Sequence, residues 1–233
     1  MAKETNEVLD KVQGIWGKYN KKITYIGFAV ILLASGWIGY QKLIKEPKEL
    51  KAAETIFLAE NLFDKMSTTG FSKDSVNIVL NGGAFDGSNV TGLLKFINNY
   101  EGTLNANRAK YMVGACYLQI GEFDKDIKYL KEFDGSHSDQ VQSKAYTMLG
   151  HAYAEKKQKE EALNYYKKAA SVNEKDESFT PDALMICGSY AEVIGKNDQA
   201  VECYNKLKNK YPTFVSVSNG DVDKRLARLG EFN

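Results

Sequence analysis

Cysteine and histidine, the side chains that most often do chemistry in proteins, are few and scattered in this sequence. Three cysteines occur, at Cys116, Cys187 and Cys203, and two histidines, at His137 and His151. They form no CxxC pair, and a zinc site needs a tighter cluster. We therefore expect no metal ion and no other cofactor. Free cysteines are usually buried apolar side chains; whether Cys187 and Cys203 lie close enough to be oxidised is left open.

Other chemistry is equally unsupported. A catalytic nucleophile needs a positioned base, and His151 has no serine, cysteine or aspartate partner in a recognisable motif. Lysine and arginine number 31 against 30 acidic residues, whereas a nucleic-acid binder would show a basic excess or stripe. The sequence therefore predicts a protein that is not an enzyme, has no small-molecule substrate and binds no nucleic acid.

One segment is apolar enough to cross a membrane. Residues 23–40 read ITYIGFAVILLASGWIGY and carry no charge. As a helix they would extend about 27 Å, close to the thickness of the hydrocarbon core. Aromatic residues and lysines lie at both ends, as the two membrane interfaces favour. We predict an uncleaved transmembrane helix at 23–40; a cleaved signal peptide would have a shorter apolar core and a shorter leading segment.

A small lysine bias favours the N-terminus inside the cell. Residues 1–22 hold five lysines and three acids, whereas residues 41–60 hold four of each. The positive-inside rule then makes 1–22 a short cytoplasmic tail. In a bacterium the chain would be a single-pass inner-membrane protein with its C-terminal domain in the periplasm.

Three segments of the polar part repeat one pattern, near 107–135, 143–171 and 181–212. Gly114, Gly150 and Gly188 occupy equivalent places, 36 and 38 residues apart. Twelve positions later a small residue follows in the second and third segments, at Ala162 and Ala200. Asp126 stands there in the first. Two close-packed helices need small residues where they cross, so this spacing predicts a helical hairpin in each segment, with turns at Gly121, Lys157 and Gly195.

These residues resemble the tetratricopeptide repeat family, whose nominal period is 34. The second segment matches best and ends in Ala169, while the third keeps Tyr204 and Pro212. The resemblance implies an all-α fold: a single N-terminal transmembrane helix followed by a tetratricopeptide-repeat superhelix at 104–230. We expect Thr180 to cap the helix that Pro181 opens, Asn197 to open its partner, and a last helix at Asp223–Leu229.

The segment 48–100 is predicted to form the N-terminal helices of the soluble domain. An apolar stripe predicts a helix at 48–66, and shorter helices are expected at 74–80 and 89–100, separated by a surface turn at 81–88. Anchor, extra helices and repeats together resemble the YfgM-like proteins, which are bacterial inner-membrane proteins with a periplasmic tetratricopeptide domain. The resemblance implies an accessory or chaperone-like role at the Sec translocon. Its partners would be translocon subunits, periplasmic folding factors or secreted chains.

An alternative function remains open at this point, an envelope scaffold that bridges the inner membrane to cell-wall or outer-membrane assembly machinery. In either case the protein-binding groove implied by the family lies along the first helix of each repeat. The residues at its groove positions are Arg108, Tyr111, Leu118, Lys144, Thr147, His151, Glu155, Met185, Ser189 and Glu192.

Overall fold

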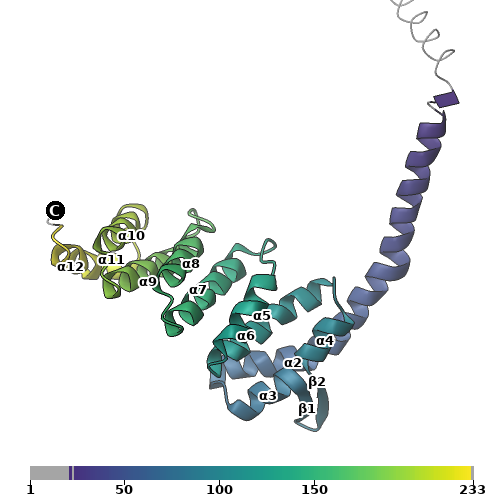
Figure 1. Cartoon of the computed structure of the whole chain (residues 1–233), viewed down its shortest axis with the longest axis horizontal. Helices are drawn as coiled ribbons and strands as arrows, with labels where there is room; N and C mark the ends of the chain where they lie inside the picture. The colour runs from purple at the N-terminus through teal and green to yellow at the C-terminus, as the bar shows by residue number, and fades with distance from the viewer. Residues whose placement is uncertain (1–20, 23, 232–233) are drawn as a thin grey trace, which may run out of the picture. The chain divides into compact units, whose positions relative to one another are not determined.

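The computed structural model describes residues 21–22 and 24–231, so most of the predicted tail 1–22 and Ile23 of the predicted span lie outside the described residues. In the described part, the regular secondary structure is helical except for one two-stranded hairpin (Figure 1). The described residues divide into two compact units, with the boundary between Lys51 and Ala52.

The first unit is a helix whose apolar side chains are exposed. Residues 24–40 are helical, and a π-helical turn follows at Gln41–Lys45. α2 (Glu46–Thr69) begins in this unit, and its residues from Ala52 onward belong to the second unit. Pro47 lies within this continuous helix, directly after the π-helical turn, and a π-helical turn is one way in which a helix accommodates a local disruption. The helix therefore does not stop at this proline. By length and composition alone, Thr24–Thr69 is long and apolar enough to cross a membrane.

The second unit begins with packed elements around one apolar cluster. α2 is followed by α3 (Lys73–Asn81), strands β1 (Gly82–Phe85) and β2 (Ser88–Thr91), and α4 (Leu93–Asn99). The prediction of a plain turn at 81–88 and a helix from 89 was wrong, because 82–91 form an antiparallel hairpin. Its tip needs positive φ at two positions, and Asp86 (φ 51°) and Gly87 (φ 77°) supply them.

Three helical hairpins then follow in the order that the repeats predicted. Their helices, the A and then the B helix of each repeat, are α5 (Leu104–Gln119) and α6 (Phe123–Glu132), α7 (Asp139–Glu155) and α8 (Lys159–Ser171), and α9 (Thr180–Val193) and α10 (Asn197–Lys210). Each helix packs on its predecessor, and the A helices of neighbouring repeats also touch. Short α11 (Val215–Ser218) and α12 (Asp221–Arg228) close the chain.

The first helix of two repeats begins earlier than predicted, and its caps explain why. Thr103 accepts a hydrogen bond from Ala106 N at 3.0 Å, so α5 begins at Leu104. Ser138 caps α7 in the same way. Thr180, in contrast, is not the cap that we expected. Its hydroxyl donates to the Asn173 carbonyl at 2.7 Å, and α9 begins at Thr180 itself, ahead of Pro181.

The three A–B turns have the same backbone conformation. In each, an N–H bonds back five residues to close the first helix: Glu122 to Tyr117 O, Gln158 to Tyr153 O and Lys196 to Ala191 O, at 2.8–3.0 Å. The residue before that N–H has positive φ, which is 78° at Gly121, 77° at Gly195 and 59° at Lys157. The predicted turn positions are therefore confirmed, and one of them places a side chain in a conformation that glycine adopts more readily.

Replacing Lys157 with glycine should therefore stabilise the protein. We expect the free energy of unfolding to rise by about 0.5–1 kcal/mol, because the relief at positive φ exceeds the entropy that glycine adds to the unfolded chain. The measurement is urea unfolding of the full chain in detergent micelles. Gly195→Ala, the matched change at the equivalent turn, should shift the midpoint in the opposite direction; equal effects of both variants would contradict this account.

Candidate protein-binding face

We use the name helix-A face for the surface that carries the ten predicted groove residues on α5, α7 and α9. Its geometry starts from the glycines at the A–B crossings. A Cβ added to Gly188 would lie 2.6 Å from the ring of Tyr204, and one at Gly150 would overlap the ring of Tyr166. Only glycine lets a tyrosine of the second helix lie this close to the first helix.

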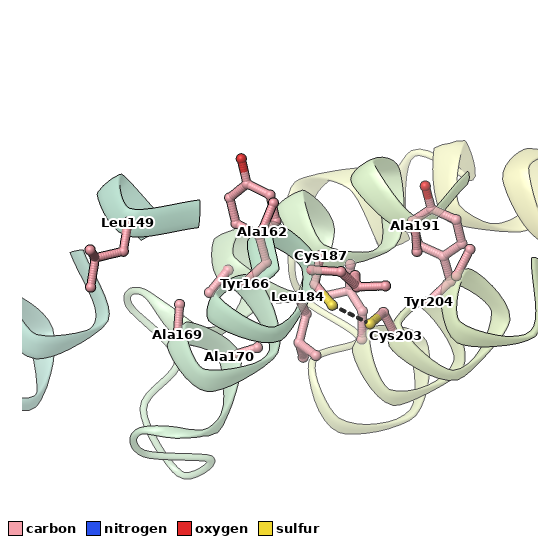
Figure 2. Close-up of a cluster of buried hydrophobic side chains, with 14 of the residues drawn as sticks. Leu149, Ala162, Tyr166, Ala169, Ala170, Leu184, Cys187, Ala191, Cys203 and Tyr204 are labelled. Atoms are coloured by element: carbon pink, nitrogen blue, oxygen red, sulfur yellow. Dashed lines mark hydrogen bonds between the residues drawn. The ribbon is translucent and has the colours of Figure 1, made fainter. Parts of the chain in front are cut away.

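These two tyrosines extend past the crossing toward the helix-A face. The Tyr166 hydroxyl lies 2.8 Å from His151 Nδ1, and the two rings meet edge to face at 5.4 Å. The Tyr204 hydroxyl donates to Glu192 Oε2 at 3.0 Å. Figure 2 shows the two hydroxyls pointing the same way from the buried cluster. Polar atoms of the B helices thus contribute to a face that we had assigned to the A helices alone.

Glu192 is already engaged by the C-terminal helix α12. Arg225 Nη1 donates to its Oε2 at 3.0 Å, and Arg228 Nη2 donates to its Oε1 at 3.1 Å. Arg225 also donates to the Tyr204 hydroxyl at 3.1 Å. The carboxylate of this predicted groove residue is therefore largely neutralised within the chain.

Two predicted residues at the other end of the face are also engaged. Arg108 forms an ion pair with Glu60 of α2. Burial is the larger influence on Glu60 and raises its pKa, while Arg108 opposes that shift. The Tyr111 ring packs against Phe133 at 5.5 Å. Both residues help to join α5 to its neighbours, although the Arg108 side chain is still 57% exposed.

The middle of the face, on α7, is the most accessible part. Lys144, His151 and Glu155 are exposed, and the Thr147 hydroxyl donates to the Ser143 carbonyl at 3.0 Å. Desolvation lowers the pKa of His151, with Glu155 acting in the opposite direction. The imidazole is therefore neutral at pH 7, where it can exchange hydrogen bonds with a bound chain.

The remaining predicted residues are half-buried. Leu118, Met185 and Ser189 all fall in this class. Met185 packs against the core of the repeats, and Ser189 Oγ lies 3.4 Å from the Tyr204 hydroxyl. The face thus combines an accessible polar centre on α7 and the exposed Arg108 with half-buried residues on α5 and α9.

Three hollows on the surface of the described residues lie elsewhere. One of about 430 Å³ borders α3 and the first A–B turn, one of about 260 Å³ borders the start of α5, and one of about 80 Å³ borders α8, α9 and α10. None of the three contains any of the ten predicted residues. Among the described residues, no group of three or more histidine, cysteine or carboxylate side chains is placed to hold a metal ion.

Sequence reasoning missed the polar role of Tyr166 and Tyr204, which it assigned to the core. A signal was available, because tyrosine recurs at the same repeat position while the first repeat has Leu130 there. Sequence reasoning also could not foresee that Arg225 and Arg228 of α12 would bind the Glu192 carboxylate, since both arginines lie outside the repeat pattern.

Family models agree with the presence of helical repeats. Two family models, both described as tetratricopeptide repeat, match residues 143–176 and 188–213. Among solved structures, the crystal structure of MamA protein is similar with a TM-score of 0.43 and 21% identity, covering 76% of this chain and 87% of that chain. A search of curated proteins found no match.

The second and third hairpins are therefore tetratricopeptide repeats, and the fold is all-α with a repeat superhelix. Repeats of this kind support a role in protein–protein interaction.

Proposed function

We propose that this protein is a non-catalytic interaction module, anchored in the bacterial inner membrane, that serves as an accessory or chaperone-like component of the Sec translocon. Its N-terminus would be cytoplasmic and its repeats periplasmic. The observation that carries the proposal is the pairing of one exposed apolar helix with a repeat domain whose α7 face is polar and accessible.

The anchor is supported by the exposure of the first unit. Large apolar side chains are more than half exposed along residues 25–38, among them Ile26 (65%), Leu33 (75%) and Trp37 (64%). Such a continuous apolar surface is unfavourable in water and suited to lipid. The resemblance to YfgM-like proteins supports the direction of insertion and the link to protein export.

An anchored domain needs only weak contacts to act on chains that emerge nearby. Tethering raises the effective concentration of the binding face at the membrane. Lys144, Thr147, His151 and Glu155 present donors and acceptors of both charges along α7. A mixed surface of this kind suits many different extended chains better than one fixed partner sequence.

Site-specific crosslinking in cells is the direct test. A photoreactive residue placed at His151 in the intact, anchored chain should capture translocon subunits, folding factors or secreted chains, identified by mass spectrometry. Glu161, exposed on the second helix of the same repeat, is the matched control position. We expect little capture from it, because it lies on a B helix, away from the helix-A face.

The other outcomes are informative. Capture of cell-wall or outer-membrane assembly proteins alone, without export components, would replace the proposal with the envelope scaffold. Equal capture from His151 and Glu161 would show that α7 is not the binding face.

Charge reversal gives a second, quantitative readout. Lys144→Glu should weaken capture from His151 severalfold while leaving the urea midpoint unchanged, since Lys144 is exposed. Arg108 is less suitable for this purpose because its ion pair with Glu60 makes it part of the fold. Unchanged capture in Lys144→Glu would indicate that charge on α7 does not contribute to binding.

A further inference from the structure

The third repeat contains a pair of thiols in direct contact. Cys187 of α9 and Cys203 of α10 are 0% and 5% exposed, and their Sγ atoms lie 2.7 Å apart (Figure 2). A covalent S–S bond is about 2.05 Å long, so only a small approach of the two sulfurs separates contact from bond. The A and B helices of this repeat thus hold two thiols ready to be joined.

Comparison with the other repeats shows that the pair belongs to the third repeat alone. The equivalent positions are occupied by Leu149 and Tyr165 in the second repeat, and by Val113 and Tyr129 in the first. Packing at this crossing therefore accepts large apolar side chains and does not require sulfur. Two cysteines at both of these positions in one repeat are better explained by a role for their chemistry.

A small hollow gives access to the pair. A cavity of about 80 Å³ is lined by both cysteines together with Lys167, Glu202 and Lys206, whose side chains are partly exposed. Cys203 is the more exposed of the two thiols, at 5% against 0% for Cys187. Its contact with Cys187 and the charges of Lys167 and Lys206 lower the pKa of Cys203, while burial and Glu202 act in the opposite direction. Cys203 is therefore the better nucleophile, since the thiolate is the reactive form. Burial raises the pKa of the third cysteine, Cys116, to about 12.

We propose that Cys187 and Cys203 are a thiol–disulfide exchange site, at which a disulfide-bearing oxidant converts the pair reversibly into a disulfide that fastens α9 to α10. The Cys203 thiolate attacks one sulfur of the oxidant and expels the other as a thiolate, forming a mixed disulfide. Cys187, after losing its proton, attacks Cys203 Sγ and expels the second thiolate. The chain loses two electrons and two protons, and the oxidant is reduced to two thiols.

The consequence is a change in the stability of the last repeat. The bond closes a short loop around the turn at Gly195, which restricts the unfolded chain. We expect the melting temperature of the full chain to rise by about 5–10 °C on oxidation. The inference does not depend on the function proposed above.

The test uses the full chain in detergent micelles, equilibrated with reduced and oxidised glutathione, alkylated and digested with trypsin. The expected product joins the peptide 176–196 to the peptide 197–206, while the Cys116 peptide remains alkylated. The change Cys116→Ala should leave this result unaltered. In Cys187→Ala the reaction should stop at a mixed glutathione disulfide on Cys203, whereas Cys203→Ala should keep Cys187 as a thiol.

Other outcomes would overturn the proposal. One is that the folded wild-type chain keeps all three thiols reduced, while the same oxidising mixtures link the two peptides in the chain unfolded by urea. Another is oxidation that consumes Cys116 as readily as the pair, or that joins two chains. Mixed disulfide accumulating on Cys187 instead of Cys203 would reject the assignment of the attacking thiol.

Discussion

Replacing Asp126 with alanine is expected to stabilise the protein by on the order of 4 kcal/mol at pH 8. Asp126 is 0% exposed, and its carboxyl oxygens have no hydrogen-bond partner among the described residues. It occupies the crossing position that Ala162 and Ala200 hold in the other repeats, also at 0% exposure. Alanine at this position therefore fits the crossing as it does in the other two repeats. It also removes a buried polar group that has no partner.

The effect should depend on pH in a defined direction. Burial raises the pKa of Asp126 from 3.8 to about 8. The folded chain thus holds the proton more tightly than the unfolded chain. The contribution of this proton to the stability of the wild type is fully present below about pH 4. It is lost as the pH rises toward about 8. The advantage of Asp126→Ala should grow by up to about 1.4 kcal/mol per pH unit across that window.

Urea unfolding of the full chain at pH 5 and pH 8, with hydrogen exchange to localise the change in α5 and α6, measures this effect. Asp198→Ala is the matched control, because Asp198 lies in the first turn of α10 but is exposed. We expect that control to change stability by less than about 1 kcal/mol. An Asp126→Ala variant no more stable than wild type at pH 8 would show that the carboxylate is accommodated by water or by local opening.

Gly150→Ala is expected to destabilise the protein by about 2–3 kcal/mol. The added methyl group would overlap the Tyr166 ring. That ring cannot move aside freely, because its hydroxyl bonds His151 and its edge packs against Tyr190 at 4.9 Å. The measurement is again the urea midpoint of the full chain, with hydrogen exchange in α7 and α8.

Making Gly150→Ala in a Tyr166→Ala background tests whether overpacking against the Tyr166 ring causes the destabilisation. Tyr166→Ala alone should cost about 3–5 kcal/mol through the cavity that it leaves. In that background the change Gly150→Ala should become neutral or stabilising, because alanine favours helix over glycine by about 1 kcal/mol. A loss of the same size in both backgrounds would rule out the Tyr166 ring as the cause.

Much of the repeat domain could be predicted because its rules are local. The glycine at each crossing, the small residue twelve positions later and the turns at Gly121, Lys157 and Gly195 all follow from helix geometry within one hairpin. The hairpin at 82–91 could not be predicted in this way. Its glycines and polar residues fit a surface turn equally well, and pairing of β1 with β2 depends on contacts between strands.

The surroundings of the predicted groove residues were only partly predictable for the same reason. Lys144, His151 and Glu155 are exposed on α7 as their repeat positions imply. Ion pairs that engage Arg108 and Glu192 come from Glu60 and from Arg225 and Arg228, which lie far away in the sequence. No periodic rule connects those positions. Only the packing of α2 and α12 reveals which predicted groove residues already form ion pairs within the chain.

By itself, the sequence determined the apolar first helix, the helical class of the fold and the register of the repeats. These depend on residue type and on spacings within about one repeat. Tertiary structure decided the rest: the buried Asp126 without a partner, the Tyr166–His151 bond, and the contact between Cys187 and Cys203. Each of these depends on how closely two helices approach, and that distance is set by the packing of all the side chains between them.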